Sequence, residues 1–126
     1  LRLGYDEVLA HNIYAAADIL LMPSLYEPCG LTQMIGMRYG VIPVVRETGG
    51  LKDTVIPYNE NTGEGNGFSF ANYNAHELLF ILQQVVREYY EEKVRWKGLV
   101  ENARKGDFSW HASAEKYAEL YKTLTE

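Results

Sequence analysis

The residues best suited to chemistry lie in one short segment, in which a carboxylate precedes the glycine that opens an expected helix. Glu27 and Gly30 lie between an apolar run over 19–22 and a helix expected over 32–39. The first backbone N–H groups of a helix lack partners within the helix, and the helix dipole adds partial positive charge there. Such a helix start can bind an anion. An acid beside an anion site suggests chemistry at a phosphate-bearing leaving group.

Glu27 allows two interpretations, and spacing alone favours neither. As a structural residue it would cap the helix or be solvated in a loop, although Tyr26, Pro28 and Cys29 make this segment less polar than most loops. As a functional residue it would accept hydrogen bonds from sugar hydroxyls and stabilise positive charge at an anomeric carbon. The helix start would then stabilise the leaving phosphate. Preorganised charge stabilisation is worth roughly 100- to 1000-fold in rate per group.

The residues after this carboxylate are candidates for binding a donor substrate. Gly30, Leu31, Thr32 and Gln33 would offer backbone N–H groups to a diphosphate, and the Thr32 hydroxyl would add a contact. The structural alternative is a helix start in which glycine only permits close packing. Cys29 is a candidate reactive thiol because it precedes a helix N-terminus. We prefer a packing role for its side chain, with backbone contacts to substrate.

A second glycine turn follows the next apolar run. Thr48, Gly49 and Gly50 form a turn in which backbone can approach a ligand closely, and its position after a strand gives it weight. Glu47 raises a rival interpretation, a glycosidase-like pair with Glu27 if the two carboxyl groups stood about 5 to 9.5 Å apart. We favour it less, because a hydrolase does not need two glycine-rich anion sites.

The elements expected around these turns alternate between strands and helices. Continuous apolar runs predict buried strands over 19–22 and 41–45, and a shorter strand is expected over 67–71. Helices are expected over 6–17, 32–39, 74–90, 93–105 and 109–124, with a short helical turn over 51–55. This order predicts a parallel α/β sheet with right-handed crossovers. Both glycine turns then lie at the carboxyl edge of the sheet, where open α/β sheets bind ligands.

The helix over 32–39 is expected to turn Met34, Ile35 and Met37 toward the sheet and to end at Gly40.

The expected strands are too few for a complete nucleotide-binding domain, and the chain begins directly with a helix. We therefore expect a fragment of a longer protein.

Composition limits the classes of partner. The 126 residues suffice for one domain with a core, and 47% hydrophobic with 23% charged residues is ordinary for a globular chain. A net charge of −5 argues against nucleic acid. The lone cysteine fits a reducing compartment, and no apolar run approaches the roughly 20 residues that span a bilayer. We expect a soluble cytoplasmic protein with no membrane partner. His11, His76 and His111 lack metal-ligand spacing, so no metal site is predicted.

The order of these motifs closely resembles the C-terminal part of bacterial glycogen synthases and plant-type starch synthases. The Glu-Pro-Cys-Gly-Leu-Thr segment followed by Thr-Gly-Gly-Leu is specific to this group, and the resemblance covers nearly the whole chain. It is carried by the segments 5–7, 10–11, 13–15, 18–24, 27–33, 39–40, 43, 48–51, 53–55, 67–68 and 107–110.

The resemblance implies a retaining GT-B glycosyltransferase that moves glucose from ADP-glucose to the non-reducing end of an α-1,4-glucan, without a metal or other cofactor. Such enzymes have two Rossmann-like domains. This chain would be an incomplete C-terminal one: 1–106 would be a partial nucleotide-sugar-binding domain, and 107–126 a helix crossing to the absent N-terminal domain. The fragment alone would be inactive. The compartment would be bacterial cytoplasm, or plastid stroma in a plant.

The resemblance also assigns roles to particular residues. Glu27 matches the key acidic residue at the donor glucose, and the segment 29–32 matches the one that contacts donor glucose and phosphates. Many related transferases carry a second glutamate where this chain has Ile35, a departure that agrees with the glycogen and starch branch. Two alternatives stay open: a UDP-sugar-dependent GT-B transferase, and a non-catalytic α/β module that binds a nucleotide or phosphate.

Overall fold

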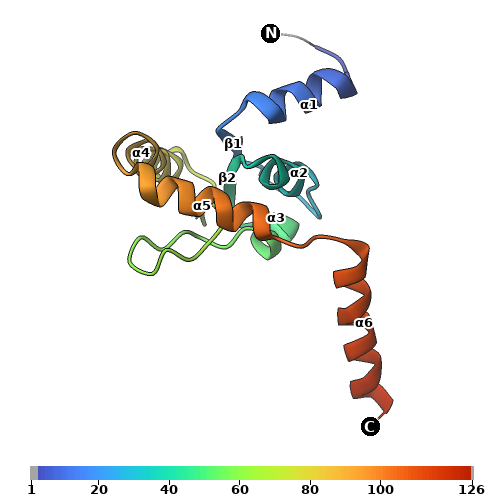
Figure 1. Ribbon diagram of the computed structural model, residues 1–126. Coiled ribbons are helices and arrows are strands. Elements are labelled where there is room, and N and C mark those ends of the chain that lie inside the picture. Colours follow the sequence, from blue (N-terminus) through green and yellow to red (C-terminus); the bar gives the residue numbers. More distant parts are fainter. Residues whose placement is uncertain (1–2, 126) are drawn as a thin grey trace.

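The computed structural model describes residues 3–125 and contains a parallel sheet flanked by helices (Figure 1). Within that range the sheet has three strands in the order β1-β2-β3, and both pairings are parallel. The strands are β1 (Ile19–Met22), β2 (Ile42–Arg46) and β3 (Phe68–Phe70). The predicted parallel α/β fold is confirmed, with β2 at the centre.

The helices form close to their expected positions. The short turn expected over 51–55 begins earlier than predicted, at the glycine pair. The helices are α1 (Glu7–Ala16), α2 (Thr32–Tyr39), α3 (Gly49–Thr54), α4 (Ala75–Glu91), α5 (Lys93–Lys105) and α6 (Trp110–Thr125). Figure 1 shows α6 extending away from the sheet, and none of its described residues is buried. None of the helices within 3–125 has the length and apolar character needed to cross a membrane.

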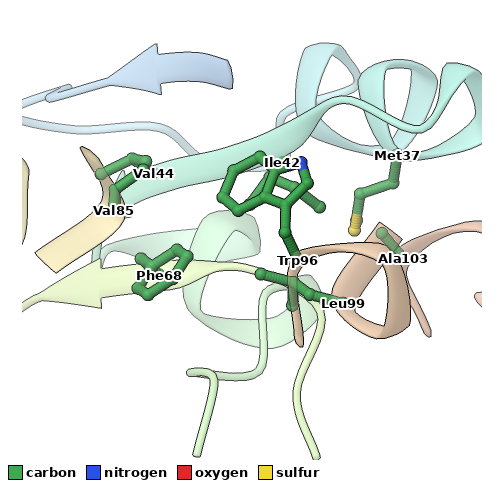
Figure 2. Packing of buried hydrophobic residues seen from close by; sticks show 8 residues of the cluster. All are labelled: Met37, Ile42, Val44, Phe68, Val85, Trp96, Leu99 and Ala103. Carbon is green, nitrogen blue, oxygen red and sulfur yellow. The ribbon is translucent and has the colours of Figure 1, made fainter. Parts of the chain in front are cut away.

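The central strand is buried on both faces, as its continuous apolar run predicts. Successive strand residues point to opposite faces, so Val44 and Val45 enter different clusters. Val45 packs with Leu51 of α3 and with Val55, the residue that follows this helix. The larger cluster lies where β2 and β3 meet α2, α4 and α5 (Figure 2); its buried members are Met37, Ile42, Val44, Phe68, Val85, Trp96, Leu99 and Ala103.

The inward face of α2 differs from the prediction at one position. Met37 is fully buried and Met34 packs against the core, as expected. Ile35 is 36% exposed, so its predicted contact with the sheet is wrong. Gln33 is buried instead, because it lies one helical turn before Met37 on the same face. Gly40 ends the helix with φ of 88°, the left-handed conformation that glycine adopts readily.

The corner between α4 and α5 contains a buried ion pair. The Glu88 side chain is 4% exposed, and its carboxylate accepts two hydrogen bonds from Arg95, at 3.0 Å from Nε and 2.9 Å from Nη2. The hydrogen bonds to Glu88, and next the negative charges of Glu88 and Glu92, raise the pKa of Arg95, although partial desolvation of the guanidinium acts in the opposite direction. The pair ties the two helices that cover the core.

Candidate functional site

The two glycine turns meet at the carboxyl edge of the sheet. β1 ends at Met22 and β2 at Arg46, and because these strands are parallel neighbours their following turns emerge on the same side. The Gly50 N–H donates to the Pro28 carbonyl oxygen at 3.2 Å, which joins one turn to the other. The convergence predicted from the strand order is therefore confirmed.

The glycines of the second turn allow this approach. A Cβ on Gly49 would lie 2.0 Å from the Glu27 carbonyl oxygen, and one on Gly50 would lie 1.8 Å from the Cys29 carbonyl oxygen. Real side chains do not approach backbone so closely. The sequence suggested that these glycines admit a ligand; the structure shows that contact between the turns already requires them.

Glu27 lies beside the start of α2. Its side chain is half-buried. The N-cap position is Leu31, which makes no side-chain capping bond, and the first turn of α2 contains no acidic residue. Helix N–H groups without a capping side chain favour an anion at this point. Thr32 is half-buried, whereas Gly30 is buried within the turn. A donor-binding role for these residues stays a prediction.

Two of the predicted site residues have surroundings that differ from expectation. The Cys29 side chain is exposed, so the preferred packing role is wrong. The turn instead uses the backbone of this residue, whose carbonyl faces Gly50 and Gln33. Gln33 is fully buried, and its amide donates to the Gly30 carbonyl oxygen at 2.8 Å. Its side chain therefore supports the turn from within the protein.

Arg46 is a residue at this edge that the sequence analysis did not identify. Its Nε donates to the Ser24 carbonyl oxygen at 2.8 Å, Nη2 donates to the Leu25 carbonyl, and Nη1 donates to the Ala71 carbonyl oxygen at 3.3 Å. The guanidinium lies 5.9 Å from the ring centroid of Tyr73. Arg46 thus holds the segment before Glu27 against the end of β3. The available signal was a cation at the end of an otherwise apolar strand.

The second glutamate has a partner of its own. Glu47 Oε1 accepts a hydrogen bond from Ser69 Oγ at 2.7 Å, which engages it with β3. This structural role accounts for Glu47 without a pairing to Glu27. Within residues 3–125, no group of three or more histidine, cysteine or acidic side chains is placed to hold a metal ion.

The sheet, the crossovers and the glycine turns at its carboxyl edge define a Rossmann-like α/β domain, in incomplete form. Comparison with known families then identifies it further: residues 3–106 match the glycosyl transferases group 1. Because the match covers most of the chain, the chain belongs to this glycosyltransferase family.

Particular relatives agree with the resemblance drawn from the motifs. The chain is 60% identical over 97% of its length to a glycogen synthase of Desulfitobacterium hafniense, covering 26% of that protein. It is 56% identical over 99% of its length to a glycogen synthase of Clostridioides difficile, again covering 26% of the relative. The chain thus spans about a quarter of these curated relatives.

Solved structures show the same fold. The catalytic domain of starch synthase IV from Arabidopsis thaliana, bound to ADP and acarbose, matches with a TM-score of 0.85 and 45% identity, over 96% of this chain and 25% of that one. A sucrose-phosphate synthase from Thermosynechococcus elongatus matches with a TM-score of 0.66 and 27% identity, over 97% and 29%. The predicted fold, an incomplete GT-B C-terminal domain, is confirmed.

Proposed function

We propose that this chain is the donor-binding half of an ADP-glucose-dependent glycogen synthase, which transfers glucose to the non-reducing end of an α-1,4-glucan with retention. The observation that carries the proposal is the 60% identity to a glycogen synthase over 97% of the chain. The geometry alone would also suit a simple nucleotide-binding module. Identity this high across both turns favours the synthase over the module. ADP in the related starch synthase supports an adenine nucleotide donor.

The proposed chemistry uses the edge at which the turns meet. The donor diphosphate would bind N–H groups at the start of α2, over residues 30–33, with further contacts from 48–50. Glu27 would orient the glucosyl group and stabilise positive charge on its anomeric carbon. As the bond from that carbon to the diphosphate oxygen breaks, the acceptor hydroxyl would attack on the same face. Its proton would pass to the leaving diphosphate.

The rest of the enzyme would lie outside this chain. We propose that 1–106 forms part of the nucleotide-sugar-binding domain and that 107–126 crosses to an N-terminal domain. The exposed side chains of α6 support this division, because Trp110 is 91% exposed and Leu124 is 73% exposed. Such apolar exposure is typical of an interaction surface. The chain alone would then be inactive and bind ADP weakly. The bacterial relatives support a bacterial cytoplasmic setting.

The test is transfer of labelled glucose into glycogen by the full-length protein, with ADP-glucose and UDP-glucose compared. Glu27→Ala should lower turnover from ADP-glucose by at least about 100-fold, because it removes preorganised charge from the reacting centre. Glu101→Ala, at an exposed position on α5, is the matched control and should leave turnover unchanged.

Each other outcome argues against the proposal. Faster transfer from UDP-glucose would identify a UDP-sugar transferase. Absence of transfer from either donor, together with tight ADP binding by the isolated chain, would favour the binding module. Near-normal turnover of Glu27→Ala would remove the proposed role of that carboxylate.

A further inference from the structure

A buried side-chain amide lies beneath the two glycine turns. Gln33 is fully buried, and its Nε2 lies 2.8 Å from the Gly30 carbonyl oxygen, 3.4 Å from the Cys29 carbonyl oxygen and 3.1 Å from Thr54 Oγ1. All three neighbours are oxygens, so the amide must present its NH₂ group to them. The first two belong to the turn that follows Glu27.

The third neighbour continues the connection to the other turn. The Thr54 hydroxyl donates to the Gly50 carbonyl oxygen at 2.6 Å, and it therefore accepts from Gln33. The Gln33 amide and the Thr54 hydroxyl form one hydrogen-bonded chain from the first turn to the second. We call this pair of side chains the clip.

The surroundings of the clip indicate that its orientation matters. The Gln33 Oε1 atom is buried and makes no hydrogen bond to any described residue. Buried polar atoms without partners are uncommon and destabilising. Gly30 adopts φ of +70°, and a Cβ there would lie 2.5 Å from this oxygen. The Gln33 amide therefore holds its NH₂ group against the turns even though this orientation leaves its own carbonyl oxygen without a partner. Glycine at position 30 leaves the space that this oxygen occupies.

We propose that Gln33 and Thr54 are positioning residues, which fix the separation of the two glycine turns and thereby place Glu27 and the donor-binding backbone. This inference rests on the proposed function, and it assigns the side chain of Gln33, as distinct from its backbone N–H, no direct contact with the donor. A displacement of about 1 Å near reacting groups can lower a rate by about 100-fold. Loosening the clip should therefore affect turnover more than acceptor binding.

The test uses the full-length protein and pairs of closely matched variants. Thr54→Val keeps the shape and removes the hydroxyl, whereas Thr54→Ser keeps the hydroxyl. We expect Thr54→Val to lower kcat by about 10- to 100-fold with the glucan KM unchanged, and Thr54→Ser to restore most of the rate. Gln33→Met should lower kcat similarly, while Gln83→Met, at an exposed position on α4, should not. Because the residues act together, the double variant should lose little more than Gln33→Met alone.

Hydrogen exchange gives a readout that does not depend on activity. In Thr54→Val, backbone hydrogen exchange should rise at Gly50 and also in the segment 29–31, which belongs to the other turn and is joined to Thr54 through Gln33. A merely local role would raise exchange only around 50–54, and that result would overturn the proposal. A wild-type kcat in Thr54→Val would overturn it as well. If Gln33→Met does not fold, the Thr54 pair still decides.

The proposed function is tested separately by the unsubstituted protein. Absence of glucose transfer by that protein would reject the synthase assignment, and the exchange measurement would still decide whether the clip joins the turns. Transfer that is lost in Glu27→Ala but unaffected in Thr54→Val would retain the synthase assignment and reject the clip.

Discussion

Replacing Gly50 with alanine tests the contact on which the site depends. The new Cβ would lie 1.8 Å from the Cys29 carbonyl oxygen and 2.8 Å from the Cys29 Cα. Both atoms belong to backbone, which cannot turn aside as a flexible side chain does. The turns must therefore separate by about 1 Å or more, because interiors are close-packed. Overpacking of this kind typically costs about 1–3 kcal/mol, and a shift of about 1 Å at reacting groups costs about 100-fold in rate.

The assay combines urea unfolding with glucose transfer by the full-length protein. Gly98→Ala is the matched control, because no heavy atom lies within 4 Å of a Cβ at this position on α5. Alanine there should stabilise the protein by about 0.5–1 kcal/mol and leave transfer unchanged. Gly50→Ala should be destabilised and nearly inactive. A Gly50→Ala protein as stable and as active as the unsubstituted one would refute the proposed packing of the turns.

Three further predictions concern other contacts. Arg46→Met should lower glucose transfer by about 10- to 100-fold by freeing the segment before the acid, and Arg46→Lys should not restore it, because lysine lacks the planar fork that reaches several carbonyls; equal rates for all three proteins would contradict this. Arg95→Met should lower the free energy of unfolding, measured in urea, because Glu88 keeps a buried carboxylate without its charged partner; an unchanged urea midpoint would count against it. Hydrogen bonds from Asn72 hold the pKa of Glu77 below its ordinary 4.5. The stability that the ionised Glu77 carboxylate contributes is therefore present above about pH 4.5, its ordinary pKa, and is lost as the pH falls through the lowered pKa. Glu77→Gln should flatten the acid side of a plot of unfolding free energy against pH, and a plot of unchanged slope would contradict the assignment.

Local patterns predicted the fold and the position of the site well. The continuous apolar run at β2 indicated a strand covered on both faces, and the burial of Val44 and Val45 in different clusters confirms it. Both glycine turns could be placed at one edge because parallel strands share their direction. These inferences needed only neighbouring residues along the chain.

The interactions that support the turns could not be found in this way. Gln33 is a polar residue on the buried face of a short helix, and only the folded chain brings Thr54 to its amide. Arg46 bonds carbonyls of Ser24 and Leu25, and backbone carbonyls carry no sequence signal. The exposure of Cys29 likewise follows from how the turn pairs its backbone with Gly50.

The central claim is that the edge beside Glu27 binds the donor diphosphate. A crystal structure of the full-length protein with ADP tests it most directly. The account predicts phosphate oxygens within hydrogen-bonding distance of backbone N–H groups at the start of α2, over residues 30–33, with Glu27 at the open side. ADP bound elsewhere, with no phosphate contact to this segment, would contradict it.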